Sequence, residues 1–388
     1  MLNSNRTELL TGKRGLTMSV NIASNPFKLG FGLMRLPRLE DGQIDVPQVS
    51  QMVDKFIEAG GTYFDTAFAY QGSEEAARKA LVERYPRESY TLATKLIAMG
   101  EGLDEETLKQ EFYTSLERTG AGYFDYYLLH ALQRSNYENY EKFHLWDFVK
   151  ELKEKGLIKH YGFSFHGDPD LLVELLEKHP DAEFVQLQIN YADWENPGVA
   201  SRRNWEICKQ YGKPVIVMEP VKGGILADPI DEVKAVFDKE NNGLSYSSWA
   251  VRFVASKDNI LAVLSGMSSL EQMEDNLSYM RDFKPLTEHE EEVIKAAQEA
   301  LNGDKSIPCT SCRYCTKGCP MEIPIPDIFT VANRMKGSPH FRTVREYTIV
   351  TQDKGKASDC IQCGQCEAAC PQQLPIIELL EKCREMEQ

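Results

Sequence analysis

The chain has 388 residues, enough for two or three ordinary domains or for one large barrel with an additional domain. Its 42% hydrophobic and 27% charged residues are typical of globular proteins, and no run approaches the roughly 18 apolar residues of a membrane span. Disordered, collagen-like and membrane-spanning classes are therefore excluded, and a net charge of −15 without a basic stripe argues against nucleic acid or anionic membranes as partners.

Residues 1–26 are predicted to form an extension that precedes the folded domains. The opening residues are polar and lack the apolar core of a secretory signal, which predicts a cytoplasmic protein. Met18 is a candidate for the natural start, because the recognisable pattern begins soon after it.

Residues 27–302 alternate short apolar runs with longer amphipathic stretches, which is typical of a parallel sheet with crossover helices. An eighth strand, near residues 243–248, has too weak a pattern to be placed, but eight strands would close a (β/α)8 TIM barrel of about 250 residues. No glycine-rich dinucleotide fingerprint or P-loop supports another α/β fold. The seven clear runs are 62–65, 90–94, 126–129, 160–163, 185–188, 215–218 and 261–264.

Four polar residues lie at or just after successive strand ends, where the chemistry of such barrels is found. Each has an ordinary explanation: a helix cap for Asp65, loop packing for Tyr70, a solvated end for Lys95 and a satisfied core histidine for His130. Together, at the same end of a predicted barrel, they indicate a catalytic group.

Over residues 27–285 the sequence resembles the aldo/keto reductases. The matching segments are 29–35, 60–67 with Tyr70 and 73–74, 94–95, 128–130, 162–164 and 265–276. The resemblance implies a catalytic tetrad in which Tyr70 donates the proton, Lys95 and Asp65 support it, and His130 orients the substrate carbonyl. Free tyrosine is a weak acid near neutrality, and a nearby ammonium would stabilise its phenolate. A neutral histidine can donate a hydrogen bond to the developing oxyanion.

The resemblance also implies a nicotinamide cofactor, NAD(H) or NADP(H), across the barrel mouth. It places the carboxamide near Ser164 and Gln186 and the pyrophosphate near Lys222, Gly223 and Gly224, where glycine permits close backbone approach. The chain departs from the family where Phe165 replaces an asparagine and Met218 a stacking tyrosine, so another ring such as a flavin is an alternative. Further predicted contacts are Gly32, Met34, Arg35, Ser265, Gly266, Gln272 and Asn276.

Residues Gly266 and Gln272 stand where relatives that use NADPH carry two cations for the 2′-phosphate. Because each charge-assisted contact contributes about 1.5–3 kcal/mol, NADH is the expected cofactor unless Lys257 or Arg281 substitutes. The carbonyl substrate is not indicated. Four aromatic residues either line an apolar mouth or pack within the barrel: Phe31, Phe68, Tyr191 and Trp194.

Eight of the ten cysteines form two C-x2-C-x2-C-x3-C-P runs after residue 308. This spacing is typical of [4Fe–4S] clusters, because three thiolates wrap one cube and the fourth completes the other. A zinc site usually takes two cysteines from each of two C-x2-C pairs, so the third and fourth cysteines of each run would have no role as zinc ligands. The runs are Cys309, Cys312, Cys315 and Cys319, then Cys360, Cys363, Cys366 and Cys370.

The two runs resemble the bacterial two-cluster ferredoxins, here in a mostly α-helical form spanning residues 303–388. The resemblance implies that Cys370 joins the first three cysteines of the first run and that Cys319 joins those of the second. Helices are predicted at 327–335 and after Pro375, and an acidic helix at 287–301 precedes this domain. Cys208 and Cys383 are expected to be ordinary helix residues.

Three functions remain open. The chain is predicted to reduce an aldehyde or ketone with a nicotinamide while its clusters transfer electrons, with a ferredoxin or flavoprotein as redox partner. Alternatively, it is an electron-transfer protein whose barrel serves for docking or flavin binding, or its clusters are purely structural. The intact tetrad favours the enzyme.

Overall fold

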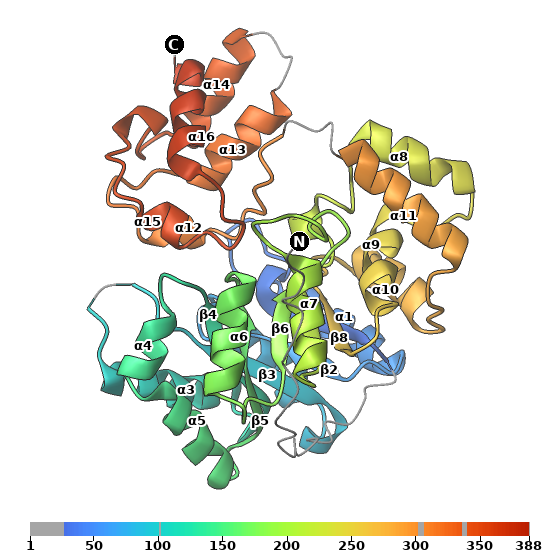
Figure 1. Cartoon of the computed structure of the whole chain (residues 1–388), viewed down its shortest axis with the longest axis vertical. Helices are drawn as coiled ribbons and strands as arrows, with labels where there is room; N and C mark the ends of the chain where they lie inside the picture. Colours follow the sequence, from blue (N-terminus) through green and yellow to red (C-terminus); the bar gives the residue numbers. More distant parts are fainter. Residues whose placement is uncertain (1–26, 101, 302–305, 336–339, 388) are drawn as a thin grey trace, which may run out of the picture.

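A computed structural model describes residues 27–100, 102–301, 306–335 and 340–387, and Figure 1 shows a barrel with a helical domain above it. The predicted extension, residues 1–26, lies outside the described residues. Within the described ranges, no helix has the length and apolar character needed to cross a bilayer.

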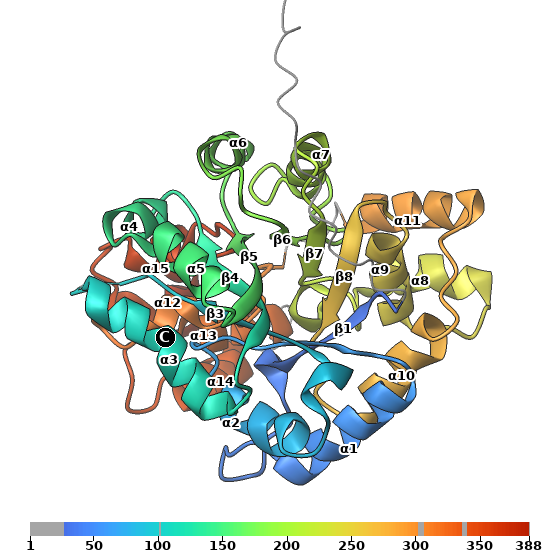
Figure 2. The same cartoon turned by 90° about the horizontal axis from the view of Figure 1, so that it is seen from below.

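Eight parallel strands close into a barrel in chain order, which confirms the predicted fold class. Figure 2 shows the strands as a ring with helices outside it. Tyrosine, leucine, phenylalanine and alanine side chains fill the interior, and a larger core packs between strands and helices. The strands are β1 Leu29–Gly32, β2 Tyr63–Asp65, β3 Thr91–Leu96, β4 Phe124–Leu132, β5 Ile158–Phe165, β6 Val185–Gln188, β7 Val215–Met218 and β8 Ile260–Ser265.

The prediction of a strand near residues 243–248 is wrong. Ser245 instead caps the next helix, its side chain accepting a hydrogen bond from the Ser248 amide. The strand that closes the barrel is β1, which pairs with β2 and β8. Half of its four residues are glycine, and a Cβ at Gly30 would lie 2.7 Å from Leu264 Cδ2. The crowding explains why this strand lacks an apolar run.

Several of the outer helices begin at side-chain caps that the sequence supplies. Asp45, Asp104, Asp168 and Ser269 each accept a hydrogen bond from an amide in the first turn of a helix. The helices are α1 Val46–Glu58, α2 Ser73–Ala77, α3 Glu105–Thr119, α4 Tyr137–Lys142, α5 Leu145–Glu154, α6 Pro169–Lys178, α7 Ser201–Gln210, α8 Asp231–Phe237, α9 Tyr246–Ala255, α10 Leu270–Met280 and α11 Glu288–Leu301.

The described residues after 305, called the C-terminal domain below, have their own hydrophobic core. The helix predicted at 327–335 is α13, and the helix predicted after Pro375 is α16. Their apolar faces pack in this core, as do six of the eight cysteines and Cys383. The helices are α12 Tyr314–Lys317, α13 Ile325–Arg334, α14 His340–Val350, α15 Gln365–Ala368 and α16 Ile376–Cys383.

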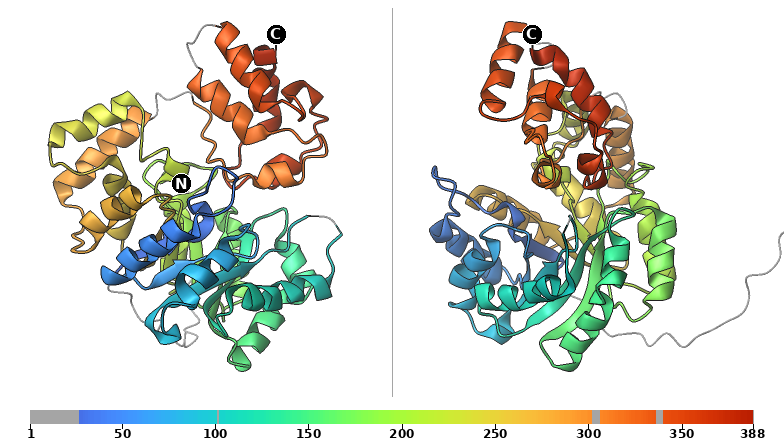
Figure 3. Two further views of the ribbon diagram at one scale, coloured as in Figure 1. Left: turned by 180° about the vertical axis from the view of Figure 1, so that it is seen from behind. Right: turned by 90° about the vertical axis from the view of Figure 1, so that its left-hand side faces the viewer.

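The C-terminal domain covers the end of the barrel where the strands end, as both views in Figure 3 show. After β4, the Gln133 side chain and the Ser135 hydroxyl donate to the Ala368 carbonyl at 2.6 and 2.8 Å. After β1, Arg35 donates to the Thr310 carbonyl at 2.8 Å. These contacts place the cysteine-bearing segments directly over the predicted catalytic residues.

Candidate functional site

A buried ion pair lies at the base of the site. Lys95, in β3, donates from Nζ to Asp65 Oδ2 at 2.5 Å and to the Thr66 carbonyl at 2.7 Å, and its side chain has no exposed surface. Burial raises the pKa of Asp65 and lowers that of Lys95, whereas the attraction between them opposes both shifts. Asp65 and Lys95 meet although they are thirty positions apart, because β2 and β3 are paired parallel strands and Asp65 lies opposite Ala93.

Tyr70 and His130 lie above this pair. Lys95 Nζ is 5.2 Å from the centroid of the Tyr70 ring, and the Tyr70 and His130 rings are edge to face with centroids 5.7 Å apart. The four predicted tetrad residues are thus brought together. A fifth side chain joins them from the C-terminal domain: the Tyr314 hydroxyl lies 3.5 Å from His130 Nε2.

Burial sets the charge states of these groups. It raises the pKa of Tyr70 well above the ordinary value, with smaller contributions from Tyr314 and Asp65. It lowers the pKa of His130 well below the ordinary value, and Lys95 adds to that shift. At neutral pH His130 is a neutral imidazole and Tyr70 a protonated phenol. The expected lowering of the Tyr70 pKa by Lys95 is not observed, because burial and the neighbouring Tyr314 and Asp65 all raise it.

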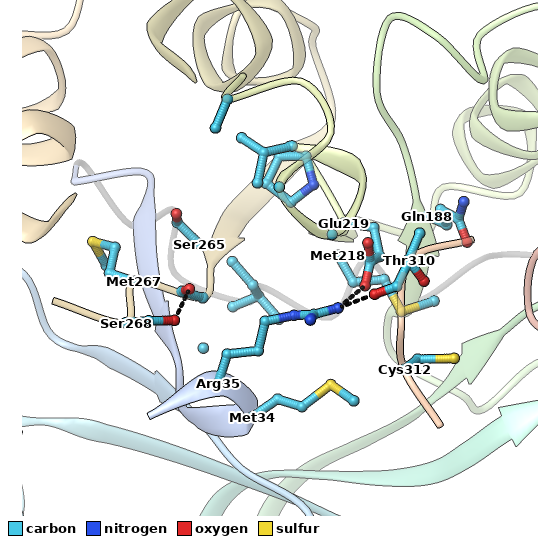
Figure 4. Close-up of a pocket in the computed structure, with 18 of the residues that line it drawn as sticks. Met34, Arg35, Gln188, Met218, Glu219, Ser265, Met267, Ser268, Thr310 and Cys312 are labelled. Atoms are coloured by element: carbon cyan, nitrogen blue, oxygen red, sulfur yellow. Dashed lines mark hydrogen bonds and ion pairs between the residues drawn. The ribbon is translucent and has the colours of Figure 1, made fainter. Parts of the chain in front are cut away.

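A cavity of about 700 Å³ extends from the tetrad to the start of α10. Figure 4 shows Arg35 reaching across it toward Thr310 and Glu219, with the Cys312 thiol on the same side. Arg35 Nη2 is 3.7 Å from Glu219 Oε1, and burial raises the pKa of Glu219. The C-terminal domain contributes Thr310, Cys312, Tyr314, Pro371 and Gln372 to the wall.

Most residues predicted to contact a cofactor line this cavity, and two do not. Ser164 accepts a hydrogen bond from the Ala131 amide at 2.7 Å, and Lys222 forms an ion pair with Asp193. Buried oxygens of Gln186 and Asn276 have no partner. The predicted residues on the wall are Gly32, Met34, Arg35, Gln186, Met218, Gly223, Gly224, Ser265, Gly266, Gln272 and Asn276.

The end of β5 differs from the sequence-based expectation. Phe165 is buried in the core between barrel and helices, so it does not face the cavity. His166, the next residue, lines the cavity, and its buried Nδ1 has no partner. Burial lowers the pKa of His166 to about 4. The rule that selected His130, a polar residue at a strand's carboxyl end, could also have selected His166.

The aromatic residues that were candidates for an apolar mouth are packing residues. Phe31 and Tyr191 are fully buried in the core, and Trp194 packs against it. Phe68 lies under the Arg118 guanidinium, 4.6 Å from its ring centroid. None of the four belongs to the described lining of the cavity.

The eight cysteines of the two runs divide between two small apolar cavities. Among the described residues, no group of three or more His, Cys, Asp or Glu side chains is arranged to hold a single metal ion. One cavity is lined by Cys309, Cys312, Cys315 and Cys370, and the other by Cys319, Cys360, Cys363 and Cys366. Each set joins three cysteines of one run to the last cysteine of the other. Four thiols around an apolar space fit a [4Fe–4S] cube.

Comparisons with known proteins agree with both parts of the chain. The model of the aldo/keto reductase family matches residues 28–299, and that of the 4Fe-4S dicluster domain matches residues 308–374. An uncharacterized oxidoreductase of Bacillus subtilis is 24% identical over 71% of this chain and 93% of its own length. The L-galactose dehydrogenase of Arabidopsis thaliana is 25% identical over 76% of this chain and 94% of its own length.

Solved structures of the same fold cover the barrel. The holo form of an aldo-keto reductase from Bacillus halodurans superposes with a TM-score of 0.56 at 25% identity, over 70% of this chain and 92% of that one. An aldo-keto reductase from Klebsiella pneumoniae in complex with NADPH has a TM-score of 0.55 at 19% identity, over 70% of this chain and 91% of that one.

Proposed function

The chain belongs to the aldo/keto reductase family, and we propose that this oxidoreductase reduces the carbonyl group of a small aldehyde or ketone with a nicotinamide cofactor. The observation that carries the proposal is the arrangement of Tyr70 and His130 above the Lys95–Asp65 pair, at one end of a large cavity. Two [4Fe–4S] clusters in the C-terminal domain are part of the proposal.

Each residue of the tetrad has a task that its geometry supports. A carbonyl oxygen near Tyr70 and the neutral His130 can accept a hydrogen bond from each, which polarises the carbonyl. Tyr70 then transfers its proton to that oxygen. Lys95, held by Asp65 and the Thr66 carbonyl, keeps a cation beneath the tyrosine ring. The C-terminal domain contributes part of the wall at this end of the cavity.

The residues on the cavity wall fit a nicotinamide, which when bound supplies the hydride. The unpartnered oxygens of Gln186 and Asn276 are acceptors that a carboxamide or adenine amine can satisfy. Gly266 lies beside Arg35, where an added Cβ would be 3.7 Å from the arginine Cδ, and Gly32 lies beside the Ser265 backbone. Lys222 is committed to Asp193, so we propose that Arg35 is the cation closest to the bound nucleotide.

A second candidate function, electron exchange through the clusters, is favoured by one observation: Cys312 lines the same cavity as Tyr70. Hydride transfer moves two electrons and a cluster accepts one, so a flavin or flavoprotein partner would have to connect them. Anaerobic stopped-flow mixing with NADH, with and without flavin, would follow cluster bleaching. Bleaching supports electron exchange, and its absence under both conditions leaves a structural role for the clusters.

The test of the proposed reduction is Tyr70→Phe, which removes the phenol proton donor at nearly constant volume. Steady-state assays of iron-loaded protein with NADH or NADPH and a carbonyl panel should show activity in the wild type and a loss of at least about 100-fold in the variant. Tyr113→Phe on α3, where the side chain is 41% exposed, is the matched control. An active Tyr70→Phe variant would remove Tyr70 from the proton-donor role.

A further inference from the structure

His166 follows β5 and faces the cavity that begins at the tetrad. Phe163 and Phe165 pack in the core between barrel and helices. Because side chains alternate along a strand, the residues after each of them, Ser164 and His166, face the inside of the barrel. His166 lines the cavity accordingly, and together with Pro371 of the C-terminal domain it also lines a smaller cavity beside it.

His130 reaches the same space from the neighbouring strand. Leu128 fills the barrel interior, so His130, two residues further along β4, faces the inside as well. Around Ala131, whose φ is 57°, β4 has one extra residue relative to β5. The His166 amide donates to the Leu132 carbonyl at 2.9 Å, which fixes the end of β5 beside this bulge.

The two imidazoles have the same ring nitrogen available for a ligand. In both His130 and His166 the buried Nδ1 has no hydrogen-bond partner among the described residues. Buried N–H groups without a partner are rarer in proteins than unpaired acceptors, so the proton of each neutral ring belongs on Nε2. Burial lowers the pKa of both histidines, which are therefore neutral at pH 7. Two N–H donors on adjacent strands thus serve one cavity.

The proposed reaction uses one of these two donors. His130 donates to the oxygen of the reacting carbonyl. Within the described ranges, neither nitrogen of the His166 ring forms a hydrogen bond, and the Gln373 side chain contacts only its backbone carbonyl, at 3.2 Å. A buried polar group without a partner costs free energy, so a ligand that brings an oxygen to His166 Nε2 is favoured over an apolar one.

The charges around the cavity favour an uncharged oxygen over a carboxylate. Arg35 is the one lysine or arginine among the described lining residues, and it already donates to the Thr310 carbonyl. A carboxylate on the ligand would meet like charges, whereas a hydroxyl or carbonyl oxygen accepts from a neutral imidazole without that cost. Besides Asp65, the acidic residues on the wall are Glu219, Asp228, Glu271 and Asp275.

The level of His166 in the barrel favours the substrate as the source of this oxygen. Ser164 and Gln186, the residues implied for the nicotinamide carboxamide, lie opposite each other in the pairing of β5 and β6. His166 lies two residues beyond Ser164, nearer to the C-terminal domain. Neighbouring strands are about 4.8 Å apart, so donors from His130 and His166 suit two oxygens of one small molecule.

We propose that His166 is a specificity-determining residue, which donates a hydrogen bond from Nε2 to a second, uncharged oxygen of the substrate beside the reacting carbonyl. The preferred substrates are then α-hydroxy carbonyl and 1,2-dicarbonyl compounds. The proposal rests on the proposed function. The carboxamide oxygen of a nicotinamide has the same acceptor chemistry, so the experiments below distinguish the two sources.

The kinetic test compares hydroxyacetone with butanone, which has nearly the same shape and carries a methyl group in place of the hydroxyl. Hydroxyacetone is intrinsically the more reactive, so the quantity of interest is how a substitution changes the ratio of the two kcat/KM values in iron-loaded protein with NADH. His166→Leu should lower this ratio about tenfold, as expected for the loss of one hydrogen bond. His166→Gln keeps an N–H donor and should retain part of it. An unchanged ratio in His166→Leu would overturn the proposal.

Two control variants leave the His166 ring in place. Gln373→Ala removes the side-chain contact with the His166 backbone and should keep the wild-type ratio, as should His144→Gln at a side chain that is 63% exposed. A change in Gln373→Ala equal to that in His166→Leu would assign the effect to domain docking and overturn the proposal.

A binding measurement separates the substrate from the nicotinamide. In protein with ¹⁵N-labelled histidine, the His166 resonances are those that His166→Leu deletes. With NAD⁺, which has no hydride to donate, added hydroxyacetone should shift these resonances and butanone should not. A shift with NAD⁺ alone, together with equal losses of kcat/KM for both carbonyls in His166→Leu, would assign His166 to the carboxamide and overturn the proposal. Wild-type protein that shows the hydroxyacetone shift but reduces no carbonyl would support the binding role of His166 and contradict the proposed function.

Discussion

Gly223 and Thr310 meet at the seam between the domains, where a Cβ on the glycine would lie 2.7 Å from the threonine Cβ. The sequence predicts that the glycines at 223 and 224 allow a phosphate to approach the backbone closely. In the structure the backbone that approaches Gly223 is that of Thr310, while Gly224 has open space around it. One glycine of the pair therefore serves the domain interface, and the other is free for a ligand.

Alanine substitutions at these two positions should differ in stability. Both glycines have positive φ, 66° and 103°, so either alanine carries backbone strain. Gly223→Ala also crowds Thr310, which adds about 1–3 kcal/mol of overpacking. Urea unfolding of iron-loaded protein under anaerobic conditions should show this extra loss in Gly223→Ala relative to Gly224→Ala. Equal midpoints for the two variants would mean that the domains do not pack at Gly223.

Much of the barrel was predictable because its strands are buried on both sides and read as apolar runs. The strand β1 was missed because Gly30 makes room for Leu264, a requirement set by a residue more than two hundred positions away. The segment 243–248 was mistaken for a strand, although Ser245 is a typical helix cap. Contacts between distant residues inside a closed barrel cannot be predicted from the hydrophobic pattern of a single segment.

The tetrad was predictable from strand ends, whereas the contribution of the C-terminal domain was not. Nothing in the spacing of the cysteines indicates that Tyr314 reaches His130, since that contact depends on how the two domains dock. His166 did carry a signal, because it directly follows a strand. The sequence predicts that Phe165 perturbs the nicotinamide site, but the alternation of side chains along β5 turns it toward the core.

Interleaved ligation is the second prediction. Cys319 shares a cavity with Cys360, Cys363 and Cys366 rather than with its own run. We expect anaerobically prepared protein to contain about eight irons per chain, and Cys319→Ser to damage the cluster of the second run. In electron paramagnetic resonance spectra, a double variant with Cys319→Ser and Cys363→Ser should be damaged in that same cluster. Cys309→Ser should instead damage the cluster of the first run. Zinc in place of iron would contradict the assignment, and Cys208→Ser is the control.

Acid sensitivity is the third prediction and follows from His166. Its folded-state pKa of about 4 lies below the ordinary 6.5 because of burial. Between these values the unfolded chain binds a proton that the folded chain excludes, so the free energy of unfolding falls as pH decreases from 6.5 toward 4. The slope for one proton approaches about 1.4 kcal/mol per pH unit. His130, with a pKa lowered in the same direction, adds to the effect.

The measurement compares urea unfolding of the wild type and His166→Gln across this pH range. As pH decreases, the free energy of unfolding of the variant should fall less steeply than that of the wild type, by up to the slope that one proton contributes. Above pH 7 the two slopes should be equal. His144→Gln, at a side chain that is 63% exposed and lies 3.0 Å from Glu105, is the comparison for the loss of a surface imidazole. Parallel curves for wild type and His166→Gln would show that this imidazole is accessible to protons in the folded state.

The last prediction is a preference for NADH over NADPH. Gly266 and Gln272 line the cavity where relatives that use NADPH are expected to carry cations, and the side-chain oxygen of Gln272 already accepts a hydrogen bond from the Ser268 amide at 2.7 Å. Glu271 and Asp275 line the same end of the cavity, so a 2′-phosphate would meet like charge. Lys257 is engaged by Glu291 at 3.2 Å and does not line the described cavity.

The ratio of kcat/KM for the two nucleotides should therefore favour NADH by about tenfold or more, since each missing charge-assisted contact is worth about 1.5–3 kcal/mol. Glu271→Gln combined with Gln272→Arg should move the ratio toward NADPH by removing one repulsive charge and adding one attractive charge. Glu274→Gln is the matched control, because this carboxylate sits on the same helix but pairs with Lys55 and is 60% exposed. A tenfold preference of the wild type for NADPH would mean that another cation, such as Arg35, binds the 2′-phosphate.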